Sequence, residues 1–247
     1  MIVFLSETKA YEDRMQVIAK KIGFQNLVAI GPKGRAGGLC MLWVNDLEVE
    51  ILEFNSNMIA IQIKECNVCW SLVGFYGPPY KAKHLKTWIN LCALLETIQG
   101  PWMCCWDFNV LIDDTEKVRG VCGSSSTPGY LKELMFDLAA MDLGFVGNKF
   151  TWSNHRWGRN SIREWLDSGI ANIYLRLAFP KATVLHLGGV NSDHCPLLID
   201  TNPDDSFSPR PFRFEAVWAK DPRCYEVINL AWNKNFVGSA GVRTTTL

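Results

Sequence analysis

Hydrophobic residues in this 247-residue chain are grouped into short runs separated by polar residues, glycine and proline. Such runs, bounded by turn-forming residues, are typical of β-strands. The run at 102–110 is strongly apolar in its first half, which indicates a central strand. Strands are predicted in this way at 1–5, 39–44, 49–54, 58–63, 68–76, 102–110, 149–153, 161–167, 182–187 and 196–200.

Other segments repeat apolar residues every three or four positions, the spacing of an amphipathic helix. Met15, Ile18 and Ile22 form one such stripe, and Gly23 ends it. On this spacing, helices are predicted at 11–22, 85–98, 130–141 and, outside the main domain, 222–233.

The many antiparallel-looking strands, interspersed with helices, favour two sheets packed face to face over a doubly wound parallel sheet. We therefore predict an α/β (α+β) domain over 1–202, with two packed, mostly antiparallel sheets flanked by helices. Residues 203–247 have the composition of a linker and a C-terminal tail, which is partly helical. A domain rarely starts within a strand, so we expect an earlier strand to precede residue 1.

The amino-acid composition limits the kinds of molecule that this protein is expected to bind. The 25 basic and 25 acidic side chains cancel, whereas a protein that coats nucleic acid is usually basic. Any contact with DNA must therefore depend on a local basic patch. Nine scattered cysteines, several within apolar runs, are typical of buried thiols in a reducing compartment. Cys66 and Cys69 have CxxC spacing, but no second pair follows at zinc spacing.

The chain shows no sign of a membrane segment. No run approaches the roughly 18 apolar residues that span a bilayer. The first residues lack the charged region and cleavage site of a signal peptide. We therefore expect an intracellular protein that does not contact a membrane.

Polar clusters at predicted strand ends are candidates for chemistry, because scaffolds present reactive groups there. Asp107 and Asn109 are separated by one residue, so on a strand both would face one cleft while Phe108 turns into the core. The carboxylate can take a proton from water, and the carboxamide can orient a phosphate oxygen. The alternative is an Asx turn at a strand end, which the spacing alone favours.

Glu7, Asp167, Asp193 and His194 lie at other predicted strand ends. Carboxylates and an imidazole suit hydrolysis assisted by a hard metal ion. Asp167 is a candidate to orient His194 through its other ring nitrogen. The alternative for each residue is an ordinary solvated or half-buried strand end. The sequence contains no GxxxxGK[ST] phosphate loop, no GxSxG elbow and no HExxH zinc motif.

Seven short segments, in order, are FLSETK (4–9), GRAGGL (34–39), GFYG (74–77), WDFN (106–109), FTWSN (150–154), WLDS (165–168) and SDHCPL (192–197). Together they resemble the endonuclease/exonuclease/phosphatase superfamily, and in particular the endonuclease domain of plant LINE-type (non-LTR) retrotransposon polyproteins. The likeness covers residues 1 to about 218. It implies a four-layer, DNase I-like sandwich that hydrolyses phosphodiesters in DNA with Mg²⁺, or alternatively Mn²⁺.

The resemblance also implies roles for individual residues. By position, Glu7 matches the metal ligand, and Asp193 matches the second acidic residue of the metal and water cluster. Tyr76 matches a tyrosine that contacts the scissile phosphate. Asp107 and Asn109 match the pair that activates water and orients the phosphate.

Two further groups follow from the resemblance. Asp167 and His194 match a carboxylate–imidazole pair that stabilises developing charge. The hairpin at 156–163 would lie beside DNA and contact its backbone or a groove. Its candidate nucleic-acid-binding residues are Arg156, Trp157, Arg159 and Arg163.

The chain departs from the family in three places. The family's first strand carries an asparagine that joins the metal cluster, and we expect that strand to lie outside this chain. Trp106 stands where the family usually has glycine, and we expect its indole to tilt Asp107 or obstruct the cleft. Trp165 and Ser168 replace two arginines, which removes positive charge near the phosphate path.

Three interpretations remain open at this point. A DNA-nicking endonuclease predicts metal-dependent cleavage that His194→Ala abolishes. A retroelement fragment without catalysis predicts no cleavage, and a DNA-binding module predicts salt-dependent binding without turnover. A DNA substrate leads us to expect a nuclear location; we expect no small-molecule cofactor, and the sequence assigns no oligomeric state.

Overall fold

The structure is a computed structural model that describes residues 1–34, 36–65, 68–119, 129–189, 192–203 and 222–233. Contacts divide the chain into two compact units, Met1–Arg210 and Pro211–Leu247. The first unit contains the sheets, and the second contains the helix α5 (Pro222–Trp232), close to the predicted bounds. Cys66 and most of the predicted linker lie outside the described residues.

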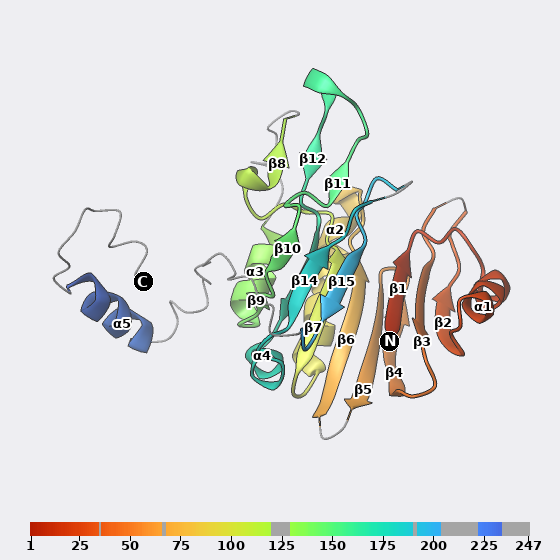
Figure 1. Ribbon diagram of the computed structural model, residues 1–247, viewed down its shortest axis with the longest axis horizontal. Coiled ribbons are helices and arrows are strands. Elements are labelled where there is room, and N and C mark those ends of the chain that lie inside the picture. The colour runs from red at the N-terminus through yellow and green to blue at the C-terminus, as the bar shows by residue number, and fades with distance from the viewer. Residues whose placement is uncertain (35, 66–67, 120–128, 190–191, 204–221, 234–247) are drawn as a thin grey trace. The chain divides into compact units, whose positions relative to one another are not determined.

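A six-stranded sheet forms the centre of the first unit (Figure 1). Its middle strands are largely buried because apolar side chains cover both of their faces. Neighbouring strands are antiparallel except β6 and β7, which are parallel. In spatial order the strands are β4 (Glu48–Asn55), β5 (Met58–Glu65), β6 (Val68–Tyr76), β7 (Trp102–Asp107), β13 (Asp167–Ala171) and β9 (Met141–Asp142).

Two three-stranded sheets share a core with one face of this central sheet. Phe4, Met41 and Val184 from the two smaller sheets pack together with Ile61 and Leu72 of the central sheet. The first small sheet has the order β1 (Ile2–Ser6), β3 (Leu39–Trp43), β2 (Asn26–Ile30), and the second has the order β10 (Phe145–Gly147), β14 (Thr183–His186), β15 (Leu197–Asp200).

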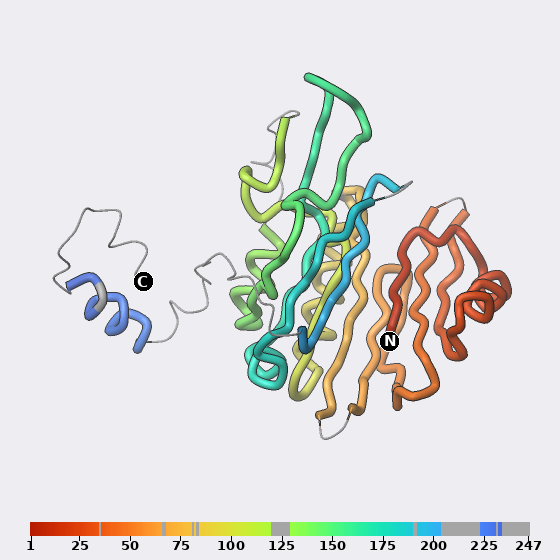
Figure 2. Tube along the Cα trace, viewed as in Figure 1, coloured from red at the N-terminus to blue at the C-terminus, as the bar shows by residue number. Residues whose placement is uncertain are grey.

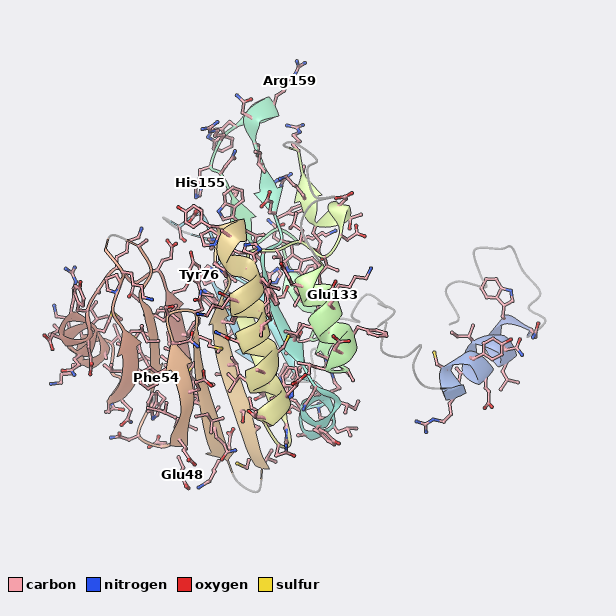
Figure 3. The ribbon with its side chains drawn as sticks, turned by 180° about the vertical axis from the view of Figure 1, so that it is seen from behind. Glu48, Phe54, Tyr76, Glu133, His155 and Arg159 are labelled. Carbon is pink, nitrogen blue, oxygen red and sulfur yellow. The ribbon has the colours of Figure 1, made fainter. Side chains whose placement is uncertain are left out.

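Two helices cover the opposite face of the central sheet. They are α2 (Lys81–Thr97) and α3 (Tyr130–Asp137), and Figure 3 shows both from that side. Trp88 of α2 and Leu134 of α3 share a second core with Phe75 of β6. The alternation along β6 therefore places successive side chains in different cores.

The outer face of the β1–β3–β2 sheet is covered by α1 (Glu12–Lys21). Met15 and Ala19 of this helix pack with Leu42 of β3 in a third core. The layers are thus helix, sheet, sheet and helix, with the short helix α4 (Ile173–Ala178) following β13. Within the described residues, no helix has the length and apolar character needed to cross a membrane.

A fourth, small sheet carries a hairpin that extends beyond the layers (Figure 2). Its strands are short because few neighbours cover them, and the hairpin tip contains a single 3-10 turn, η3 (Gly158–Asn160). The sheet has the order β11 (Trp152–Ser153), β12 (Arg163–Glu164), β8 (Lys117–Val118), and β8 directly follows the 3-10 turn η1 (Asp114–Glu116).

The predicted sandwich of mostly antiparallel sheets is confirmed, with its second sheet layer divided into two three-stranded sheets. Three predicted strands are wrong in extent, and the strand predicted at 149–153 is reduced to Trp152–Ser153. The strand predicted at 102–110 ends at Asp107, because Asn109 has a left-handed φ of 52° that ends the extended conformation. The strand predicted at 161–167 is interrupted by the buried residues Trp165 and Leu166.

Further differences concern segments with weak patterns. The half-buried strand β2, the short strands β8, β9 and β10, and the six-residue helix α4 were not predicted. The helix predicted at 130–141 ends at Asp137, because Ala139 takes a left-handed φ of 51°. As a result of the strand differences, Asn109 lies after the strand that was predicted to contain it, and Arg163 and Asp167, predicted on one strand, lie on β12 and β13.

Candidate active site

Strand ends meet on one side of the first unit and line an open cleft of about 1190 Å³. β6 and β7 are parallel, and their last residues, Tyr76 and Asp107, are register partners. β13 runs antiparallel to β7 and begins at the same edge, with Asp167 opposite Asp107. The predicted site residues that line the cleft are Glu7, Tyr76, Asp107, Asn109, Asp193 and His194.

Asp107 and Asn109 form an Asx turn rather than two steps of a strand. The Asn109 amide N–H donates to Asp107 Oδ1 across 2.8 Å, and Asn109 Nδ2 donates to Asp107 Oδ2 across 2.9 Å. The prediction that strand alternation aligns them is therefore wrong, and the turn that was the alternative is formed. Phe108 is buried between them, as expected.

This turn changes what the Asn109 carboxamide can do. Its Nδ2 group has two protons, and it donates to the Gly77 carbonyl across 2.7 Å as well as to Asp107. Both protons are thus engaged within the protein. Asn109 is placed to orient the Asp107 carboxylate, not to donate to a phosphate.

His194 lines the cleft and contacts Asp167, which is buried behind it. His194 Nδ1 donates to Asp167 Oδ2 across 2.8 Å, while His194 Nε2 lies 3.8 Å from Asp107 Oδ2. Thr151 holds Asp167 in turn, because its hydroxyl oxygen accepts the Asp167 amide N–H across 3.0 Å. The structure therefore brings together the carboxylate–imidazole pair that the sequence predicted.

Burial and charge shift the pKa values of this group. Burial, followed by the charge of Asp167, raises the pKa of Asp107, although the nearby His194 opposes the rise. Burial lowers the pKa of His194, but the hydrogen bond to Asp167 and the charges of Asp167, Asp107 and Asp193 outweigh it. The pKa of His194 is raised to about 9, so the imidazole is protonated at neutral pH.

Glu7 follows β1 with a left-handed φ of 52°. Its Oε1 accepts the Tyr76 hydroxyl proton across 2.5 Å, and its Oε2 lies 3.8 Å from Lys9 Nζ. Burial, and then the bond to Glu7, raises the pKa of Tyr76, so the phenol stays protonated. Tyr76 therefore holds Glu7, and its proton is engaged by that carboxylate.

Asp193 also lines the cleft. Its Oδ2 accepts the Trp152 indole N–H across 3.1 Å, and its carbonyl accepts the Ser153 amide N–H across 2.9 Å. His155 Nε2 donates to the neighbouring Ser192 carbonyl across 3.0 Å. The hairpin is thus tied to the loop that carries Asp193.

The four predicted nucleic-acid-binding residues lie on the hairpin and not among the residues that line the cleft. Trp157 is 93% exposed, and Arg156 and Arg159 are exposed beside it. Arg163 lies 5.2 Å over the ring of Phe150. Figure 3 shows Arg159 at the outer end of the hairpin.

Two sets of residues could hold a divalent cation. Ligand atoms of Asp107, Asp167 and His194 lie within 4.8 Å of one another. A cation among them would have to replace the Asp167–His194 hydrogen bond and enter a place where both carboxylates are nearly inaccessible. The Glu7 side chain is 47% exposed and Asp193 is exposed as well, so they fit a cation that keeps most of its waters.

The structure gives positions to Trp106, Trp165 and Ser168, the residues at which the sequence departs from the family that it resembles. The Trp106 indole lines the cleft, and its ring meets Phe4 of β1 edge-on, with centroids 5.9 Å apart. Trp165 is buried, and its N–H donates to the Asp167 carbonyl across 2.8 Å. Ser168 is the register partner of Trp106. Trp165 thus belongs to the core beneath the site.

Several polar residues of the cleft are not among those predicted from the sequence. Ser6, Trp152 and Ser192 lie within the segments that carried the resemblance, next to predicted site residues. His155 belongs to the hairpin tip, and Glu164 forms an ion pair with Lys117 across 2.7 Å. Pattern alone gives no signal for the last two, because their place depends on how the hairpin folds back.

No family model matches the chain, and no curated protein matches its sequence. Solved structures do share its fold. A Neisseria 3′ phosphatase, NExo, bound to a product DNA hairpin is 14% identical, with a TM-score of 0.60 over 81% of this chain and 88% of that one. The endonuclease domain of TRAS1, a telomere-specific non-LTR retrotransposon, is 15% identical, with a TM-score of 0.54 over 78% of this chain and 93% of that domain.

The AP endonuclease LMAP from Leishmania major is also similar, at 15% identity and a TM-score of 0.60 over 79% of this chain and 76% of that one. At such identities the likeness establishes the fold. The chain therefore has the mixed α/β sandwich found in DNase I-like endonucleases and exonucleases.

Proposed function

We propose that this chain is a metal-dependent phosphodiesterase that nicks DNA. The observation that carries the proposal is the 2.8 Å bond between His194 and Asp167, placed 3.8 Å from Asp107 where three strands meet. A carboxylate, an imidazole and a hydrogen-bonding network around an open cleft are what phosphodiester hydrolysis needs. The likeness to a phosphatase bound to DNA and to two endonucleases supports a nucleic-acid substrate.

Asp107 is the proton acceptor in this mechanism. Burial raises its pKa, and a base with a pKa near the working pH combines an available ionised form with a strong pull on the proton of water. Asn109 keeps both carboxylate oxygens oriented through its amide and carboxamide N–H groups. Asn109 is therefore a positioning residue for the base.

His194 supplies positive charge to the reacting phosphate. Asp167 fixes one proton on Nδ1 and keeps the ring protonated at neutral pH. The second N–H, on Nε2, lies 3.8 Å from Asp107 and can donate to a phosphate oxygen that gains charge in the transition state. Tyr76 keeps Glu7 in place through its hydroxyl.

Glu7 and Asp193 would hold the cation, for which we propose Mg²⁺, with Mn²⁺ as the alternative. Both carboxylates are exposed at the cleft, and such oxygen ligands suit a hard ion that retains several waters. When bound, such an ion stabilises negative charge on the phosphate. The protein's own contribution is to set both carboxylates at the edge of the cleft before substrate enters.

The origin and the location of the protein are inferred from the seven segments that resemble retrotransposon endonucleases, and not from the fold. We propose an origin in a LINE-type retrotransposon of a plant, and a nuclear location where the DNA substrate is found. The position of the motifs at 106–109 and 192–197 supports this origin, because both fall at the cleft.

The test is nicking of supercoiled plasmid by purified protein in Mg²⁺ or in EDTA. We expect nicking in Mg²⁺ that EDTA stops and that His194→Ala lowers by about 100-fold or more. Glu7→Gln should also lower nicking in Mg²⁺, because it removes a proposed ligand, and Glu133→Gln on α3, outside the cleft, is its control. Nicking that survives His194→Ala, or that proceeds equally in EDTA, would contradict the proposal.

A second candidate is DNA binding without turnover. The exposed Trp157, flanked by two arginines on the projecting hairpin, favours it. It predicts salt-dependent retention of DNA by a folded protein that leaves the plasmid intact. The same plasmid experiment therefore separates the two candidates.

A further inference from the structure

Trp106 has an unusual backbone conformation for its place in β7. Its φ of 106° lies in the left-handed region that residues with a Cβ rarely adopt. Such a conformation costs free energy and persists where surrounding contacts hold it. The contacts of the Trp106 indole therefore indicate which interactions hold this backbone conformation.

The Trp106 indole connects β7 to β1. Its N–H donates to Ser6 Oγ across 2.8 Å, and its ring meets Phe4 edge-on. Phe4 in turn lies on the bare backbone of Gly74 in β6, where an added Cβ would come within 2.4 Å of the phenyl ring. The end of β1 is thus seated on the β6–β7 pair by side chains.

No backbone ladder among the described strands joins β1 to β6 or β7, because β1 belongs to the other sheet layer. Backbone bonds fix this segment within its own layer, where the Thr8 amide N–H donates to the Gly38 carbonyl across 3.1 Å and Ser6 pairs with Leu39 of β3. The position of Glu7 relative to β6 and β7 therefore depends on side-chain contacts. Tyr76 of β6 holds the Glu7 carboxylate, and Trp106 of β7 holds the preceding residue, Ser6. The neighbouring strands β6 and β7 thus each hold one of the consecutive residues Ser6 and Glu7.

We propose that Trp106 is a positioning residue for Glu7 and acts through Ser6. The inference rests on the proposed function, in which Glu7 binds the divalent cation. Loss of the indole N–H removes the bond between Ser6 and β7, so Glu7 shifts relative to the cleft and binds the ion more weakly. The alternative, that the indole obstructs the cleft, predicts tighter binding of the cation when the ring is removed.

The test is titration of the full chain with Mn²⁺ alone, followed by calorimetry, for Trp106→Phe, Ser6→Ala and the double variant. Phenylalanine keeps a ring against Phe4 but has no N–H, and Ser6→Ala removes the acceptor. Each single variant is expected to bind Mn²⁺ about tenfold more weakly. The double variant should bind no more weakly than either single one, because both remove the same bond.

Matched controls are Trp232→Phe in the second unit and Ser56→Ala in the β4–β5 turn, and urea unfolding checks that each variant is folded. Wild-type affinity in Trp106→Phe and Ser6→Ala, or additive losses in the double variant, would overturn the positioning role. So would tighter Mn²⁺ binding by Trp106→Gly, which obstruction predicts. If the wild type and Glu7→Gln bind Mn²⁺ equally, the metal role of Glu7 fails and this inference fails with it, whereas the proposed function is decided separately by plasmid nicking.

Discussion

His194 and Asp167 are 27 residues apart in sequence, yet His194 Nδ1 donates to Asp167 Oδ2 across 2.8 Å. The bond joins the loop before β15 to the first residue of β13, and so connects the second sheet layer to the central sheet. It also fixes which ring nitrogen faces the cleft. The proton on His194 Nδ1 therefore contributes both to the stability of the fold and to the proposed chemistry of the site.

The first prediction concerns stability and pH in EDTA. The pKa of His194 is 6.5 in its ordinary state and about 9 in the folded protein, so folding tightens its hold on the proton. This contribution is complete below about pH 6.5 and is lost as the pH rises through about 9. It is worth on the order of 3 kcal/mol by linkage. Urea unfolding at about pH 6, 7.5 and 9 measures it.

Asp107 also has a raised pKa, so its contribution is likewise lost as the pH rises, in a window that begins near its ordinary value of 3.8. The measurement is therefore made in an Asp107→Asn background, which removes that titration. There the decline that begins near pH 6.5 belongs to His194, and adding His194→Ala should flatten it. Without the charge of Asp107 the pKa of His194 is raised less, so the decline should end at a lower pH than in the wild type. A decline that persists in the double variant would assign the effect to another group.

The second prediction is that Asn109→Ala lowers kcat and leaves KM nearly unchanged. The carboxamide orients Asp107 and donates to Gly77, so its loss lets the base move without removing a contact to substrate. A misplaced catalytic group can cost about 100-fold in rate. Steady-state nicking measures both constants, with Asn45→Ala as a control for losing a bonded carboxamide elsewhere. A raised KM with unchanged kcat would instead make Asn109 a substrate contact.

The framework of this fold could be predicted because its strands are bounded by clear turns. β6 has the predicted bounds of 68–76, since alternating apolar residues there face two different cores. β2 and α4 could not be predicted in the same way. β2 is half-buried along its whole length, and α4 has only six residues, too few to establish a helical period.

The site was predictable in its residues but not in its backbone. Asp107 and Asn109 were identified as a pair, yet their alignment comes from a turn and not from strand alternation. The left-handed conformations of Trp106 and Asn109 are imposed by contacts with Ser6 and Gly77, which are distant in sequence. Local propensity carries no information about such contacts.

The third prediction is that Gly77→Ala destabilises the fold and disturbs the Asx turn. A Cβ at Gly77 would lie 2.2 Å from the Phe108 carbonyl oxygen, and backbone cannot yield as a flexible side chain does. The free energy of unfolding should fall by about 2 kcal/mol or more. Gly188→Ala is the control, because Gly188, like Gly77, has no left-handed φ and no atom lies within 4 Å of the added Cβ. Equal losses at both positions in urea unfolding would show that space at Gly77 is not limiting.

The fourth prediction separates binding by the hairpin from chemistry in the cleft. Trp157 is 93% exposed and lies outside the cleft lining, so Trp157→Ala should weaken DNA binding about tenfold and leave kcat unchanged. Trp157→Phe keeps a stacking ring and should retain most of the affinity. Arg159→Ala should reduce the slope of log affinity against log salt by about 1, as for one lost phosphate contact.

Fluorescence anisotropy of a labelled duplex over a series of salt concentrations measures these affinities, and Arg14→Ala on α1 controls for loss of an exposed arginine. A fall in kcat for Trp157→Ala with unchanged affinity would argue against the assigned role. It would mean that the hairpin acts on the site itself, and the bond from His155 to the Ser192 carbonyl provides the physical route. His155→Ala would then reproduce the same loss of kcat, whereas a hairpin that merely holds DNA predicts different effects for the two substitutions.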